Sequence, residues 1–172
     1  MKTKAGSILF AIYLILSTSL CAQGFLTVHG KIDESEFPLK GVKIKAYLSD
    51  GALFKTVKTN KEGLYQMELP LISSDKYLVI VSKKGYVSKC FLVSTENIPD
   101  SLRDTEFPPI GAFVSLFKPV KGVDYSELDH PMIGYYYNPQ KDKYEYDKAR
   151  LEQMLKVLEK IKQEEREKKQ WK

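Results

Sequence analysis

Two stretches early in the chain alternate between apolar and polar residues. In residues 25–32, Leu26, Val28 and Ile32 fall on one side, and polar residues lie between them on the other. Residues 42–48 repeat the pattern more regularly. Because successive side chains of an extended chain point to opposite faces, both stretches predict half-buried β-strands.

Further strand-like stretches follow at short intervals, separated by residues that favour turns. Residues 77–81 are apolar throughout, which predicts a strand covered on both faces in the middle of a sheet. Six or seven short strands at this spacing predict a β-sandwich rather than alternating strands and helices. The remaining predicted strands are residues 53–59, 64–69, 76–82 and 87–94.

The pattern changes after residue 95. Pro99, Pro108 and Pro109 predict an irregular connection, because proline cannot donate a backbone hydrogen bond. Residues 133–137 and 143–146 are rich in tyrosine and predict a hairpin.

One helix is predicted at the end of the chain. Asp147 is a typical helix N-cap, and apolar residues then recur at helical spacing over about three turns. Beyond residue 162 no apolar face continues, which predicts a solvated end. The apolar stripe consists of Leu151, Met154, Leu155, Leu158 and Ile161.

The first residues have the features of a secretory signal. Two lysines precede an apolar run over residues 8–16, which is too short to span a membrane. Cleavage near residue 23 predicts an extracytoplasmic product with no transmembrane span, in the periplasm, at the outer membrane or at the cell surface. Cys21 leaves a lipid anchor open as an alternative, although Leu20 is larger than the residue that normally precedes a lipidated cysteine.

These patterns divide the chain into four parts. Residues 1–23 are the predicted signal and residues 24–97 the sandwich, followed by a proline-containing linker and hairpin extension over residues 98–146 and the helix over residues 147–172. The mature chain retains a single cysteine, Cys90, which predicts a buried structural thiol rather than a disulfide.

The charge balance excludes a nucleic-acid footprint. The formal net charge of +5 falls to +3 without the two signal lysines, and this excess equals that of residues 141–172, which hold 11 basic and 8 acidic residues. A nucleic-acid surface instead has basic residues clustered without acidic neighbours.

No motif for catalysis, cofactor binding or metal binding is present. His29 and His130 each lack a second histidine or a cysteine at metal-ligand spacing. The loop from Asn60 to Gly63 has oxygen ligands and a bend, but it lacks the closing glutamate of a calcium loop. Phosphate-binding loops and nucleophile elbows are also absent from the sequence, which therefore predicts no enzyme and no cofactor.

Several short motifs occur in an order that resembles the carboxypeptidase regulatory-like domain. This resemblance, over residues 26–94, implies a prealbumin-like or Ig-like sandwich of about seven strands, without an active site, of the kind found in bacterial envelope proteins. It also implies that Asn60, Gly63 and Gly85 define turns. The motifs are HGKI at residues 29–32, FPLKGVKI at 37–44, TNKEGLY at 59–65, LP at 69–70 and YLVIVSKKGY at 77–86.

The leading hypothesis is a non-catalytic exported module that binds an envelope protein or glycan, with the C-terminal helix covering its own sheet or docking on a partner. A carbohydrate-binding module is the alternative, with Tyr135 and Tyr137 as stacking residues on one strand face. The remote alternative is an enzyme whose hidden site includes a histidine. Ser101, in the short pattern Asp-Ser-Leu, is a candidate for O-glycosylation. The sequence leaves the partner, the oligomeric state and the side of the outer membrane open.

Overall fold

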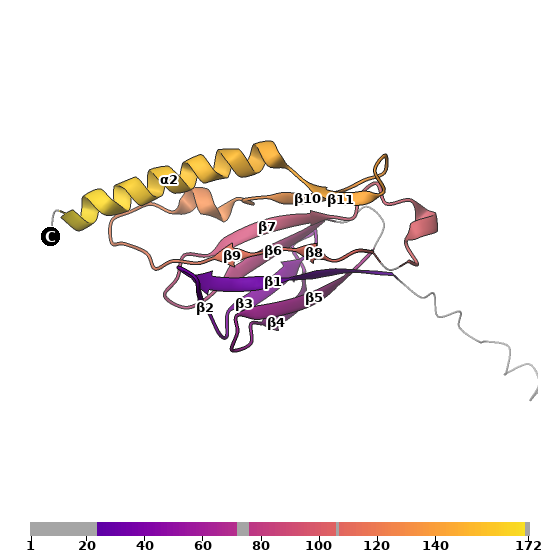
Figure 1. The fold of residues 1–172 in the computed structure, drawn as a ribbon, viewed down its shortest axis with the longest axis horizontal. Coiled ribbons are helices and arrows are strands. Elements are labelled where there is room, and N and C mark those ends of the chain that lie inside the picture. Colours follow the sequence, from indigo (N-terminus) through magenta and orange to yellow (C-terminus); the bar gives the residue numbers. More distant parts are fainter. Residues whose placement is uncertain (1–23, 72–75, 106, 171–172) are drawn as a thin grey trace, which may run out of the picture.

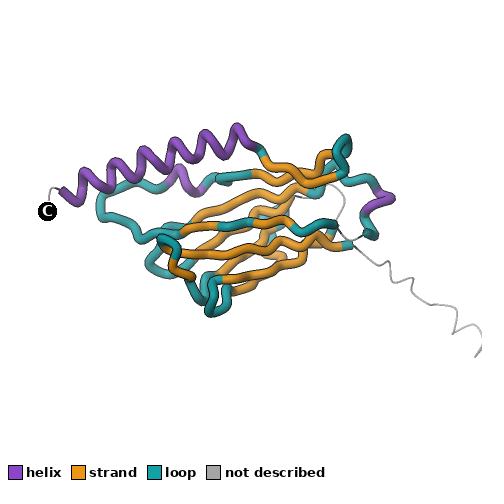
Figure 2. The backbone as a smooth tube through the Cα atoms, in the orientation of Figure 1, coloured by secondary structure: helices purple, strands orange, loops and turns teal. Residues whose placement is uncertain are grey.

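The protein is a β-sandwich with one long helix at its C-terminal end (Figures 1 and 2). The computed structural model describes residues 24–71, 76–105 and 107–170. In these residues it has eleven strands, which confirms the predicted mainly β fold. The predicted signal segment, including Cys21, lies outside the described residues.

The first sheet is built around β1 (Phe25–Glu34). One side of β1 pairs antiparallel with β5 (Leu64–Pro70) and, at its end, with β2 (Phe37–Pro38). The other side pairs in parallel with β8 (Ile110–Gly111) and β9 (Val114–Ser115). The edge of β1 is thus closed by a segment that follows it by about eighty residues in the chain.

The second sheet has the strand order β11-β10-β7-β6-β3-β4. β6 lies near its centre, as the apolar run in this strand predicted. β10 joins in parallel to β7, and the other pairs are antiparallel. The strands are β3 (Lys43–Tyr47), β4 (Leu53–Lys58), β6 (Lys76–Ser82), β7 (Lys89–Ser94), β10 (Gly134–Asn138) and β11 (Lys143–Tyr146).

The core lies between the two sheets and is made by the alternate residues that face inward. Burying each large aliphatic side chain stabilises the fold by about 1.5–3 kcal/mol. The fully buried members include Leu26, Val28, Ile32, Ile44, Met67, Leu69, Val79 and Val81.

Residues 98–146 are part of the sandwich rather than a linker beside it. Phe107, Ile110 and Leu116 are buried in the main core, and the Tyr65 hydroxyl donates a buried hydrogen bond of 2.9 Å to the Ala112 carbonyl. The prolines interrupt regular pairing, yet short segments between them can still pair at a sheet edge. The predicted boundary at residue 97 therefore does not mark the end of the core.

Helix α2 (Lys148–Gln170) is capped by Asp147, whose carboxylate accepts the Arg150 N–H at 2.9 Å. Its buried residues, Met154 and Ile161, pack with Leu128 in a second, smaller core. This core also contains Val87, which precedes β7 by two residues. The partly buried residues packed against it are Phe117, Val123, Tyr125, Met132, Val157 and Leu158.

The helix therefore rests mainly on the segment that contains the short helix η2 (Ser126–Asp129), and it runs past the ends of the strands (Figure 1). Leu155, which the sequence placed on the buried stripe, is 47% exposed. It follows Met154 directly, so it points about 100° away from it around the helix axis.

Candidate functional site

The outward faces of the two sheets differ in polarity. On the five-stranded sheet, β1 and β5 point mainly polar side chains outward, including His29 paired with Gln66 and Thr27 paired with Glu68. Phe25, Leu64 and Phe113 are exposed among them. On the six-stranded sheet, the outward residues of β6 include Leu78 and Ile80, and both are only partly buried. An outward apolar face on a central strand is typical of a surface that another molecule covers.

The apolar residues on this side form a continuous row across four strands. Leu78 of β6 lies opposite Tyr47 of β3 and Leu92 of β7, and Leu53 of β4 lies opposite Tyr47. Leu53 is 53% exposed. Together with residues 129–131 and the turn between β3 and β4, the row borders a shallow hollow of about 600 Å³.

Lysines occupy the other end of the same side. Lys43 lies directly opposite both Lys58 and Ser82, and Lys45 lies opposite Thr56. Like charges placed opposite each other in a sheet are destabilising. Within the described part of the chain, Lys43, Lys45 and Lys58 form no ion pair. We call the lysine end and the apolar row together the outer face: Lys43, Lys45, Tyr47, Leu53, Thr56, Lys58, Leu78, Ile80, Ser82 and Leu92.

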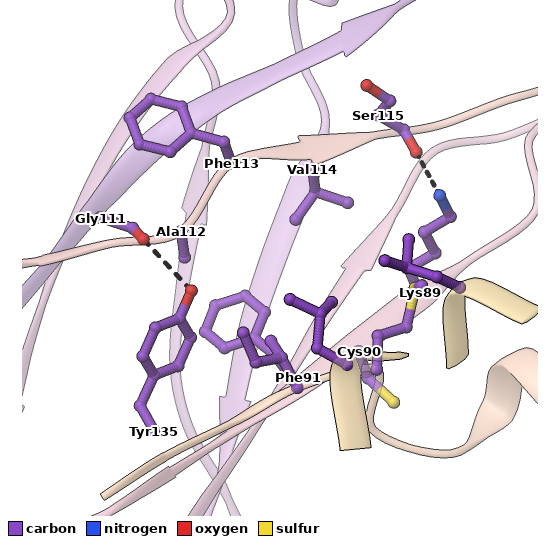
Figure 3. Close-up of a pocket in the computed structure, with 13 residues that line it drawn as sticks. Lys89, Cys90, Phe91, Gly111, Ala112, Phe113, Val114, Ser115 and Tyr135 are labelled. Carbon is purple, nitrogen blue, oxygen red and sulfur yellow. Dashed lines mark hydrogen bonds between the residues drawn. The ribbon is translucent and has the colours of Figure 1, made fainter. Parts of the chain in front are cut away.

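A second candidate site is an apolar cleft of about 330 Å³ between the two sheets, where β8 and β9 approach β7, β10 and α2 (Figure 3). Two hydrogen bonds cross the cleft. The Tyr135 hydroxyl donates to the Gly111 carbonyl at 3.2 Å, and the Lys89 ammonium donates to the Ser115 carbonyl at 2.6 Å. The remaining lining residues are Cys90, Phe91, Ala112, Phe113, Val114, Met132, Ile133, Leu151 and Leu155.

Lys89 is the charged residue in this cleft. Only 8% of it is exposed, and its ammonium lies 5.2 Å from the centre of the Phe117 ring. Burial lowers its pKa to about 8, and the nearby charge of Lys162 acts in the same direction, whereas Asp33 opposes it. Burying an ammonium without a carboxylate in contact is costly, so this residue is under electrostatic strain in the free protein.

Cys90 points to the opposite side of β7 from Lys89 and Phe91 and is covered there by the residues after η2. Its thiol donates a weak hydrogen bond of 3.4 Å to the Asp129 carbonyl. Burial raises the pKa of Cys90 to about 11, and the Asp129 charge adds to this effect. The thiol therefore has the environment of a structural rather than a reactive cysteine.

We expect Cys90 to react with a thiol reagent such as DTNB at least about 100-fold more slowly in the folded protein than in guanidinium at pH 8, since its thiolate fraction is low. The reaction rate is measured by the absorbance of the thiolate that DTNB releases. A Cys21→Ser variant leaves Cys90 as the only thiol. Equal rates in the two conditions would contradict the structural assignment.

The two histidines lie at different sites, His29 on β1 and His130 beside Asp129 at the end of η2. His29 is half-buried and meets the edge of the Phe113 ring, with 6.5 Å between ring centres, whereas His130 is exposed at the rim of the hollow. Among the described residues, no group of three histidine, cysteine, aspartate or glutamate side chains could hold a metal ion.

The predicted stacking pair is corrected by the structure. Tyr137 is only 2% exposed and packs edge-on against Phe107 and Tyr144, while Tyr135 packs edge-on against Phe91. Both rings point inward because β10 pairs with β7, which turns this face of β10 toward the core. Tyr137 therefore presents no face for a sugar, and Tyr135 is partly buried in the wall of the cleft.

The more exposed tyrosines of the hairpin do not replace this pair. Tyr136 and Tyr146 are each 41% exposed. Tyr146 lies opposite Tyr135 in the register, so it shares the face of Tyr135, whereas Tyr136 points to the other face. The two most exposed rings of the hairpin, Tyr136 and Tyr146, therefore lie on opposite faces.

The other predicted site residues lie at the surface or in turns. Ser101 is exposed in the short helix η1 (Asp100–Leu102), and its glycosylation stays a prediction. Gly63 and Gly85 have φ angles of +74° and +83°. The Asn60 side chain accepts the N–H groups of Glu62 at 3.1 Å and Leu64 at 2.8 Å.

Sequence reasoning missed both candidate surfaces. The apolar run in β6 was visible, but it was interpreted as a strand covered on both faces by this chain. Lys89 gave no local signal, because a lysine within an apolar strand is ordinarily exposed. In the described part of the chain, no helix is long and apolar enough to cross a membrane.

Comparisons with known proteins show only distant similarity. No family model matches the chain, and no curated protein matches it. Among solved structures, the Bacillus anthracis TIE protein is 18% identical with a TM-score of 0.39, over 54% of this chain and 18% of its own.

Two further structures have similar scores. The shaft pilin SpaA from Lactobacillus rhamnosus GG is 14% identical with a TM-score of 0.41, over 56% of this chain and 50% of the pilin. Catechol 1,2-dioxygenase from Acinetobacter radioresistens is 14% identical with a TM-score of 0.42, over 58% of this chain and 53% of the enzyme. This chain thus spans about half or less of the length of these proteins, and the similarities assign neither partner nor activity.

Proposed function

We propose that this chain is a non-catalytic, exported binding module of the carboxypeptidase regulatory-like type that docks on an acidic protein of the cell envelope through its outer face. The observation that carries the proposal is the contrast between the two outward sheet faces. The five-stranded sheet presents mainly polar side chains with Phe25, Leu64 and Phe113 exposed among them, whereas the six-stranded sheet combines a continuous apolar row with lysines that form no ion pair.

The apolar row supplies the driving force for docking. Leu53 is more than half exposed, and Tyr47, Leu78, Ile80 and Leu92 are partly exposed, so a partner would remove apolar surface from water. The row lies on a sheet that other strands already hold rigid, so little conformational entropy is lost on binding.

The lysines set the chemistry of the partner. Lys43 and Lys58 repel each other in the free protein, and a carboxylate placed between them would remove this cost. An acidic partner surface would also be attracted over a longer distance, which favours fast association at low salt.

Site-specific photo-crosslinking in cells tests this proposal. We expect a crosslinking amino acid at position 56, in the centre of the lysine end, to capture a discrete partner whose crosslinked peptide is rich in aspartate or glutamate. The same amino acid at position 66, exposed on the outward face of the other sheet, is the matched control and should capture little.

Charge reversal of two lysines, K43E with K58E, should reduce the crosslinked product at position 56 at least tenfold. The control K168E with K169E changes the net charge equally at the exposed helix end and should leave the product unchanged. Equal capture at positions 56 and 66, or equal losses from the two double variants, would refute docking through the outer face.

A further inference from the structure

The buried ammonium of Lys89 is a polar group in the wall of an otherwise apolar cleft. It uses one hydrogen bond, to the Ser115 carbonyl at 2.6 Å. A lysine ammonium has three donors. Its remaining contact of note is the Phe117 ring, 5.2 Å away, which attracts a cation but accepts no conventional hydrogen bond.

The negative charge of Asp33 acts on this ammonium but does not offset its burial. Within the described residues, Lys89 forms no ion pair. The Asp33 carboxylate lies near but accepts a hydrogen bond from the Ser115 hydroxyl at 2.5 Å. Lys162, on α2, adds a second positive charge to the surroundings. The site therefore favours an anion from outside the chain.

The rest of the cleft has the size and polarity of a small-ligand pocket. Its volume of about 330 Å³ is at the lower end of the range typical for such pockets. Phe91, Val114, Met132 and Leu151 line it with hydrocarbon and aromatic surface.

We propose that the cleft binds a straight-chain carboxylate amphiphile, with its carboxylate against the Lys89 ammonium and its hydrocarbon chain along Phe91, Val114 and Met132. The carboxylate forms a charge-assisted hydrogen bond with a cation that has no carboxylate in contact among the described residues, and the hydrocarbon chain of the ligand buries apolar surface. A neutral alcohol of equal length gains only the burial of its hydrocarbon chain. An amine is repelled by Lys89 and Lys162.

Isothermal titration calorimetry with decanoate, decan-1-ol and decylamine, each kept below its micelle concentration, tests the proposal at pH 7. We expect decanoate to bind at least about tenfold more tightly than decan-1-ol, and decylamine to bind more weakly than either. In carbon NMR, the resonance of carboxyl-labelled decanoate should shift on binding.

Two variants separate the roles of charge and cavity. Lys89→Met keeps an apolar chain of similar length and should abolish the preference for decanoate while decan-1-ol still binds. Val114→Trp, on a half-exposed edge strand, fills the cleft and should weaken both ligands, and thermal unfolding verifies that each variant is folded.

Equal affinity for decanoate and decan-1-ol, no binding of decanoate, or an unchanged preference in Lys89→Met would overturn the proposal. Because the outer face is on the other side of the six-stranded sheet, failure here leaves the docking proposal untouched, and failure of the crosslinking test leaves this one untouched.

Discussion

Replacing Gly63 by valine is expected to lower the free energy of unfolding by about 3 kcal/mol or more. Gly63 has a φ of +74°, a left-handed conformation that costs a β-branched residue roughly 1–2 kcal/mol or more. A Cβ at this position would also lie 2.4 Å from the Ile32 carbonyl oxygen, so the backbone must shift.

That carbonyl cannot move freely. The Ile32 carbonyl accepts the Leu39 N–H at 2.9 Å, and the Ile32 N–H donates to the Gly63 carbonyl at 2.8 Å. A shift at Gly63 therefore disturbs the junction of β1, β2 and β5 together. Urea unfolding followed by circular dichroism measures the loss.

Gly85→Val is the matched control. Gly85 has a φ of +83°, but a Cβ built there has no neighbour within 4 Å. The control should therefore show the backbone cost alone, about 1–2 kcal/mol. If Gly63→Val lost no more stability than Gly85→Val, the close approach of Ile32 would have no energetic consequence, and this explanation of the turn would be wrong.

Replacing Lys89 by methionine is expected to stabilise the protein at pH 7 and to lose this advantage at high pH. Burial lowers the pKa of Lys89 to about 8 in the folded protein, against about 10.4 in an unfolded chain. The two values correspond to a cost of up to about 3 kcal/mol for keeping the ammonium charged in the fold. The lost hydrogen bond to Ser115 offsets about 1 kcal/mol of the gain.

The direction of the pH effect follows from proton binding. Below pH 8 the lysine is charged in both states, so its full cost is present. Between about pH 8 and pH 10.4 the unfolded chain binds more protons than the folded one, so the lysine-containing protein gains stability relative to the variant as the pH rises.

Urea unfolding of the two proteins at pH 7, 9 and 10 measures the difference. Taking the difference cancels contributions that both proteins share, such as that of Cys90, whose raised pKa makes the fold less stable as the pH rises above about 9. Lys168→Met, at the exposed end of α2, is the matched control for removing a lysine. A stability difference for Lys89→Met that is the same at pH 7 and pH 10 would show that Lys89 is not held in an unfavourable environment.

The tyrosine hairpin shows where sequence reasoning stops. The alternation of residues in a strand places Tyr135 and Tyr137 on one face, and the predicted hairpin is present as the antiparallel pair β10 and β11. Which face turned inward depended on the parallel pairing of β10 with β7, which lies about forty residues earlier. No local pattern encodes that pairing, so the exposed and buried rings could not be told apart.

The apolar strand β6 gives the same lesson for the docking surface. The sequence of β6 shows that both of its faces are apolar. In the structure, the other sheet covers only the inward face. The pattern of apolar residues shows that a strand face is apolar. It does not show whether this chain or another molecule covers that face. A partner outside the chain is consistent with the same residues.

By itself, the sequence determined the longer strands, the turns and the helix, together with their combination into a mainly β-sandwich, but not the short strands β2, β8 and β9. These features depend on backbone angles and on the period of apolar residues, which are local properties. Only the tertiary structure decided that residues 107–146 complete both sheets, that Lys89 is buried in a cleft and that one sheet face stays uncovered. These features depend on pairing between strands far apart in the chain, such as β1 with β8 and β7 with β10, and such pairing is fixed by the packing of the whole core.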